Sequence, residues 1–163
     1  MKKYFVKFLA FILALCVPFA ILFFYVQSLP SIHNKSIGAT IRYKIELVKN
    51  TAQDTPRIIL VGGSSSPYGT ICSEFTKEFN LPCINIGATA YLGLEYYISA
   101  INKYARKGDI VIFAPETIIL RDKNIDYFTM WTSVDNDKAA LKCIPLSYYP
   151  GMAFSFLEYS KTK

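Results

Sequence analysis

One uninterrupted apolar run near the N-terminus constrains this chain more than any other feature. Residues 8–26 read FLAFILALCVPFAILFFYV, which is 19 residues without a charge and with a single proline. At a rise of about 1.5 Å per residue, a helix of this length nearly spans a bilayer core of about 30 Å. Tyr25 stands where an interfacial aromatic residue belongs. We therefore expect a transmembrane anchor over residues 8–26.

Other interpretations of the run fit less well. A cleaved signal peptide has a shorter apolar core and small residues at the cleavage site, whereas this run continues into QSLP without an Ala-x-Ala. A lipoprotein site at Cys16 would need a small residue before it, and Leu15 stands there. A buried core helix would normally carry a polar face, which the run lacks.

The cations around the run predict its orientation and its partner. Lys2, Lys3 and Lys7 precede it closely, whereas the basic residues on its other side begin farther away. The positive-inside rule then places the N-terminus in the cytoplasm and the rest of the chain outside the cell. The net charge of +6 includes these lysines, and no dense basic cluster follows. We therefore expect the lipid bilayer, and not a nucleic acid, as partner.

Composition divides the chain into four parts. Residues 1–7 are the cytoplasmic N-terminus, residues 8–26 the anchor, residues 27–56 a turn-rich stalk or linker, and residues 57–163 an α/β domain. Within the predicted stalk, residues 41–48 fit a short helix or a short strand, because their periodicity is ambiguous.

Short apolar runs alternate with amphipathic stretches after residue 56. They predict strands over residues 57–61, 83–86 and 109–114, with helices over residues 71–79 and 92–106 between them. This order indicates parallel crossovers and a small parallel sheet, whose functional loops lie at the carboxyl ends of the strands. The pattern fades after residue 120, and a three-stranded sheet is a marginal core, so we expect the domain to be partial.

Two loops at predicted strand ends carry the candidate chemistry. The first reads VGGSSSPYG over residues 61–69, and its paired glycines permit a sharp turn that presents Ser64 at the sheet edge. A hydroxyl there can act as a nucleophile beside backbone N–H groups, although a plain strand-to-helix turn fits equally well. The loop lacks the lysine of a Walker A loop. The second loop begins with Asn85-Ile86-Gly87.

These two loops resemble the first two motifs of the SGNH, or GDSL-like, esterase and acyl-hydrolase superfamily. Gly62-Gly63-Ser64 is similar to the family's Gly-Asp-Ser, with glycine in place of the acid as in membrane-anchored relatives. Asn85-Ile86-Gly87 is similar to its Asn-x-Gly motif. The resemblance covers about residues 57–120 and implies a three-layer, flavodoxin-like fold.

The resemblance also implies roles for individual residues. Ser64 would be the nucleophile, Gly87 and the Gly63 loop would supply oxyanion-hole N–H groups, and Asn85 would support the loop. The family's third motif, Gly-x-Asn-Asp, is replaced by Ala-Pro-Glu-Thr, so Glu116 is a structural acceptor or a site carboxylate. The last motif, Asp-x-x-His, is absent. The only histidine, His33, lies in the predicted stalk as a solvated residue.

Without a base, a serine is a weak nucleophile. The resemblance therefore implies a membrane-anchored esterase or O-acyltransferase type of protein that acts on acyl esters of cell-envelope glycopolymers, truncated or inactive in this chain. The alternative is a non-catalytic binding or scaffold module of the same fold.

Cysteine usage argues against a metal site, and no cofactor is expected. The chain has no Cys-x-x-Cys pair and no Cys/His cluster. Cys72 and Cys83 can form a bridge if their segments adjoin, but buried free thiols are the favoured interpretation.

Overall fold

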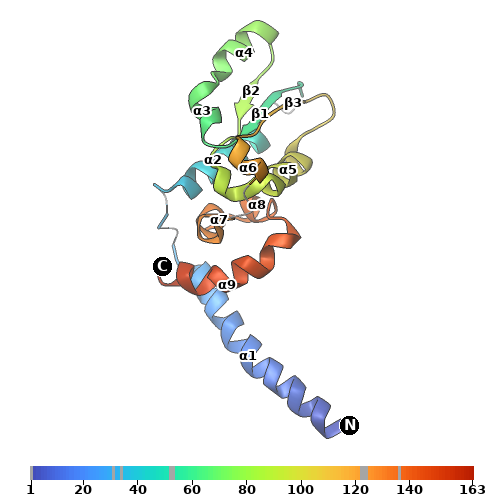
Figure 1. The fold of residues 1–163 in the computed structure, drawn as a ribbon, viewed down its shortest axis with the longest axis vertical. Coiled ribbons are helices and arrows are strands. Elements are labelled where there is room, and N and C mark those ends of the chain that lie inside the picture. The colour runs from blue at the N-terminus through green and yellow to red at the C-terminus, as the bar shows by residue number, and fades with distance from the viewer. Residues whose placement is uncertain (1, 31, 34, 52–53, 122–124, 136) are drawn as a thin grey trace.

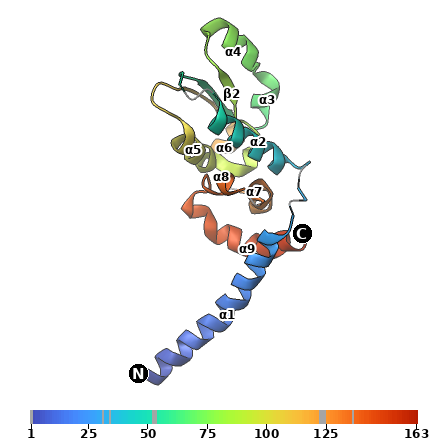
Figure 2. The same cartoon turned by 180° about the vertical axis from the view of Figure 1, so that it is seen from behind.

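A long N-terminal helix projects from a body of helices around a sheet in the computed structural model (Figure 1). The helix, α1, spans Lys2–Ser28 and is long and apolar enough to cross a membrane. The C-terminus lies beside the point where α1 joins the body, as both views show (Figures 1 and 2). The structure describes residues 2–30, 32–33, 35–51, 54–121, 125–135 and 137–163.

The sheet has three parallel strands, as the sequence predicts. They are β1 (Ile58–Gly62), β2 (Cys83–Asn85) and β3 (Ile110–Ala114), in the spatial order β2-β1-β3. All five residues of β1 are buried, which explains its β-branched, wholly apolar sequence. Within the described part of the chain β3 pairs with β1 alone, and all five of its residues are exposed.

Helices pack against β1 and β2 and form the base of the body. The crossover from β1 to β2 holds α3 (Ser65–Gly69) and α4 (Cys72–Phe79), and the crossover from β2 to β3 holds a 3-10 turn (Ala90–Leu92) and α5 (Gly93–Tyr104). The remaining elements follow β3: α6 (Thr117–Arg121), α7 (Tyr127–Val134), α8 (Lys138–Leu141), a 3-10 turn (Leu146–Tyr148) and α9 (Tyr149–Ser160).

Much of the segment expected to be a stalk is a core helix. Residues 37–50 form α2, and the hydroxyl of Ser36 caps it by accepting a hydrogen bond from a backbone N–H. The buried side chains of α2 recur at helical spacing and join the main hydrophobic core: Ile41, Ile45 and Val48. The ambiguous pattern of residues 41–48 is thus helical, and the body begins before residue 57.

A buried ion pair fastens the sheet to the helices. Arg57 directly precedes β1 and is fully buried. Its guanidinium donates a hydrogen bond at 2.6 Å to Oδ2 of Asp109, the residue directly before β3. The same guanidinium donates to the carbonyl oxygens of Tyr104 at 3.0 Å and Thr51 at 3.2 Å, and to that of Val48. One side chain therefore joins the end of α2, the end of α5 and two strands.

The last turns of α1 belong to the body. Val26 is 2% exposed and lies in the hydrophobic core. The ring of Phe23 lies 6.1 Å from that of Trp131 on α7 and 5.4 Å from that of Phe156 on α9. Phe19 also contacts Phe156, at 5.3 Å. The part of α1 before Phe19 is exposed over its whole length from residue 3.

His33 is better packed than a solvated linker residue. Its ring lies 5.9 Å from that of Tyr159, and its Nε2 lies 3.1 Å from the hydroxyl of Thr162. Nearby, Asp135 is buried and accepts from the hydroxyl of Tyr159 at 2.6 Å and from Lys163 Nζ at 2.7 Å. The base of the body thus holds the C-terminal residues in a polar cluster.

The four cysteines are free thiols, as expected, but only Cys143 is buried. Cys16 is exposed on α1, whereas Cys72 and Cys83 are partly buried. Burial and a hydrogen bond with the neighbouring Cys72 thiol raise the pKa of Cys83 to about 12. The segments of Cys72 and Cys83 therefore do adjoin.

Candidate functional site

Ser64 and Glu116 meet at the carboxyl edge of the sheet. Gly62 at the end of β1 lies opposite Ala114 at the end of β3, so the loops that follow these strands are neighbours. The exposed hydroxyl of Ser64 donates to Glu116 Oε1 at 3.2 Å. The same oxygen accepts a hydrogen bond from the backbone N–H of Ser65.

Gly63 leaves room for this carboxylate. A Cβ placed at Gly63 would lie 2.6 Å from the carboxyl carbon of Glu116 and within 2.8 Å of both its oxygens. A larger residue here, such as the acid of the family motif, would displace Glu116. The Gly63 loop, expected to help stabilise an oxyanion, therefore holds a carboxylate of the chain itself.

Glu116 is ionised at neutral pH in this arrangement. The hydrogen bond from the Ser65 backbone N–H lowers its pKa most, against a smaller opposing effect of burial. The hydroxyls of Ser65 and Ser64 lower the pKa of Glu116 further. A general base works best with a pKa near the operating pH, so Glu116 is suited to accept hydrogen bonds and poorly suited to activate Ser64.

Asn85 and Gly87 pack against Ser66, which the sequence did not single out. Asn85 Oδ1 accepts from the Ser66 hydroxyl at 3.1 Å and from the Gly87 N–H at 2.9 Å, and Asn85 Nδ2 donates to the Ser66 carbonyl at 3.0 Å. A Cβ at Gly87 would lie 2.6 Å from that of Ser66, which is 6% exposed. The Gly87 N–H, expected as an oxyanion donor, is thus bound to Asn85.

Two further side chains hold the second loop and were also missed. Lys44 of α2 donates to the carbonyl oxygen of Gly87, and burial lowers the pKa of Lys44. The hydroxyl of Tyr97 on α5 donates to the carbonyl oxygen of Thr89 at 2.7 Å. Neither residue belongs to a recognisable motif, and Lys44 lies in the segment whose helical periodicity was ambiguous.

Exposed tyrosines follow both loops. Tyr68 on α3 and Tyr91 in the 3-10 turn before α5 are both exposed, Tyr68 almost completely. A tyrosine side chain combines an apolar face with a polar tip, which suits contact with a partly polar ligand. The segments that follow the two loops thus carry exposed aromatic rings.

Neither a metal centre nor a family assignment defines the site. Among the described residues, no three or more His, Cys, Asp or Glu side chains are grouped so that they could hold a metal ion. Comparisons of the chain with family models, with curated proteins and with solved structures find no match.

Proposed function

We propose that this protein is a membrane-anchored module of SGNH-like fold that binds acylated cell-envelope glycopolymers at the Ser64–Glu116 edge without turning them over. The observation that carries the proposal is the contact between Ser64 and an ionised Glu116. This contact replaces the serine–histidine pair that an active member of the SGNH family would need.

The hydrogen bonds of the site favour binding over catalysis. Catalysis would need a base for Ser64 and free N–H donors for an oxyanion. Glu116 engages the Ser65 N–H, and Asn85 engages the Gly87 N–H. A general base contributes about 10²–10⁴-fold to the rate, so its loss alone reduces turnover towards background.

The same groups suit a carbohydrate ligand. An ionised carboxylate such as that of Glu116 accepts hydrogen bonds only, and sugar hydroxyls are abundant donors. The exposed rings of Tyr68 and Tyr91, on the segments that follow the two loops, offer apolar faces as well. The alternative function, ester hydrolysis or acyl transfer, would show itself as turnover that depends on Ser64.

Two surfaces support a position at the membrane. The long apolar helix α1 leaves the body next to α9, which lies across the base (Figure 1). On α9 the buried residues face the core, whereas Phe154, 88% exposed, and Leu157, 54% exposed, lie on the opposite side of the helix. We propose that α1 crosses the cell membrane with its N-terminus in the cytoplasm and that these two side chains rest on the outer surface of the bilayer.

The binding experiment uses the full-length protein in dodecyl maltoside micelles. Calorimetric titration with an O-acetylated oligosaccharide should show binding that Glu116→Gln weakens about tenfold, because a charge-assisted hydrogen bond becomes a neutral one. Glu74→Gln, the same change at an exposed site on α4, is the matched control and should have no effect. Equal affinities for the two variants would contradict the proposed site.

The turnover experiment separates the two functions. Hydrolysis of a short acyl ester should stay at background for the wild-type protein and for Ser64→Ala. Turnover that Ser64→Ala abolishes would show that the site is catalytic and that another group serves as the base for Ser64.

Membrane attachment is tested by fractionation. The protein should stay with membranes through alkaline carbonate, and protease added outside intact cells should degrade the body. Release of the full-length chain into the soluble fraction would contradict the anchor.

A further inference from the structure

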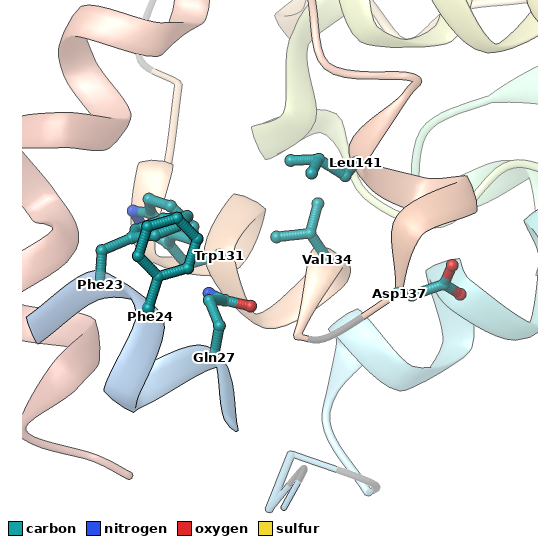
Figure 3. A pocket seen from close by; sticks show the side chains of 7 residues that line it. All are labelled: Phe23, Phe24, Gln27, Trp131, Val134, Asp137 and Leu141. Carbon is teal, nitrogen blue, oxygen red and sulfur yellow. The ribbon is translucent and has the colours of Figure 1, made fainter. Parts of the chain in front are cut away.

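A cavity lies where α1 meets the body. It measures about 330 Å³, at the lower end of the range of about 300–1,000 Å³ in which proteins hold small ligands. A neighbouring cavity of about 230 Å³ shares Phe23, Trp131 and Leu141 with it, so the two adjoin. The residues that line the larger cavity come from α1, α7 and the α8 region (Figure 3): Phe23, Phe24, Gln27, Trp131, Val134, Asp137 and Leu141.

Part of the cavity wall is formed by α1, the helix that we propose to cross the membrane. Phe23 and Phe24 belong both to the apolar run of residues 8–26 and to the cavity wall. Phe24 is 70% exposed, so one side of this wall is open to the surroundings of α1. A hydrocarbon chain in the bilayer can therefore reach the cavity along α1 without passing through water.

One polar group in the wall has no partner. Gln27 Nε2 is buried and makes no hydrogen bond with any described residue. Figure 3 shows the side chain of Gln27 at the edge of the group of lining residues, with the aromatic rings on one side of its amide and Val134 on the other. A buried donor without an acceptor is unfavourable, so a ligand that brings an acceptor to Gln27 would be favoured.

The charge of the wall restricts which acceptor fits. Asp137 Oδ1 accepts from the backbone N–H groups of Ala139 at 2.7 Å and Ala140 at 3.2 Å, which caps α8. An anionic ligand group would meet repulsion from this carboxylate. A neutral carbonyl attached to a long apolar chain satisfies both Gln27 and the apolar wall.

We propose that this cavity holds an acyl chain of a membrane glycerolipid, with Gln27 Nε2 donating to the ester carbonyl of the lipid. The proposal rests on the insertion of α1 in a membrane. A bound chain would fill the gap between α1 and α7 and would fix the body against the bilayer surface.

The sole tryptophan of the chain gives a direct test, because Trp131 lines both cavities. The full-length protein in dodecyl maltoside micelles is titrated with a phosphatidylcholine that carries bromine in mid-chain, which quenches a neighbouring indole. We expect saturable quenching at one lipid per protein. Leu141→Phe fills the cavity from a partly exposed position and should at least halve the saturable quenching. Ile71→Phe, which enlarges an exposed residue beside α4, is the control and should leave it unchanged.

A second variant tests the carbonyl contact. Gln27→Leu keeps the size of the side chain but removes the donor, and it should raise the midpoint of the titration about tenfold. Circular dichroism confirms that each variant keeps its helical content. An unchanged midpoint for Gln27→Leu would overturn the choice of an ester-linked lipid.

Other outcomes separate this proposal from the proposed anchor. Quenching that rises without saturation and equally in all variants would overturn the lipid site. A dimer by light scattering, without quenching, would also overturn it, because a second copy would then cover the cavity. Flotation with phosphatidylcholine vesicles tests the anchor independently: a protein that floats but shows no saturable quenching refutes the lipid site alone. Failure to float refutes both.

Discussion

Removing the negative charge of Asp109 should destabilise the whole body. The side chains of Arg57 and Asp109 are 0% and 2% exposed, and breaking such a buried pair by removing one partner costs about 3–5 kcal/mol. Asn at position 109 keeps one oxygen that can accept from Arg57, so we expect Asp109→Asn to lower the free energy of unfolding by about 3 kcal/mol. That is a large fraction of the roughly 5–15 kcal/mol by which native domains are stable.

The matched control is a pair of the same charges at the surface. Glu46 and Lys49 lie 3.0 Å apart on α2 with side chains 40% and 48% exposed. Exposed pairs of this kind contribute about 0–1 kcal/mol, so Glu46→Gln should change stability by no more than about 0.5 kcal/mol. Urea unfolding of the full-length protein in micelles, followed by the emission of the buried Trp131, measures both. If Asp109→Asn lowers the free energy of unfolding no more than Glu46→Gln does, the buried ion pair does not stabilise the body as we expect.

The pH dependence gives the same prediction a second test. Burial disfavours the ionised form of Asp109, but hydrogen bonds from Arg57 and from the Arg106 backbone N–H outweigh it and lower the pKa of Asp109. The ionised carboxylate therefore stabilises the fold fully above the unfolded pKa of about 3.9. This contribution is lost as pH falls through the lower, folded pKa. The wild type and Asp109→Asn should differ by a constant amount from pH 6 to 8 and converge below about pH 4.

Four substitutions, three at glycines and one on the edge strand β3, should have separable effects. Gly38→Ala, whose new Cβ would collide with a backbone carbonyl of α7, should destabilise the fold by about 1–3 kcal/mol in urea unfolding. Gly69→Ala, whose new Cβ would meet no atom within 4 Å, should lower the free energy of unfolding by at most about 0.5 kcal/mol or raise it slightly. Gly63→Ala should displace the Glu116 carboxylate and raise its pKa towards the ordinary value, which carbon NMR titration measures. Val111→Lys, on the exposed edge strand β3, should reduce concentration-dependent light scattering.

The strands could be predicted from sequence because their signals are local. β1 is an apolar, β-branched run that ends at paired glycines, and its predicted bounds differ from Ile58–Gly62 by one residue at each end. The helix α5 likewise lies inside its predicted range and ends before Gly108, a residue with a positive φ of 95°. Parallel pairing followed from the alternation of strands and helices.

α7 was missed because its buried residues include polar ones. Thr132 and Ser133 lie in the core, yet each hydroxyl donates within the helix, Thr132 to the Thr129 carbonyl at 2.8 Å and Ser133 to the Met130 carbonyl at 2.7 Å. Internal pairing of this kind allows a hydroxyl to be buried at little cost. A sequence pattern that counts hydroxyls as exposed cannot detect it.

The partners of the serines could not be predicted, because they depend on strand order. Sequence indicates that three loops share one edge, but the order β2-β1-β3 puts the β1 loop between the other two. Ser64 then meets Glu116 after β3, whereas Ser66 meets Asn85 at the end of β2. Two serines that look equivalent in the run Ser64–Ser66 thus separate into an exposed residue beside a carboxylate and a buried residue that ties two loops together.

This separation supports the proposed binding function over catalysis. The central loop is fixed on its β2 side by Asn85, which also binds the N–H of Gly87. On its β3 side Glu116 accepts from both Ser64 and the Ser65 N–H. The N–H groups of Ser65 and Gly87 are therefore engaged by the chain itself, and a substrate carbonyl would have to displace Glu116 to reach the first and Asn85 to reach the second. The carboxylate instead keeps acceptor capacity for a second donor, which a ligand hydroxyl can supply without any rearrangement.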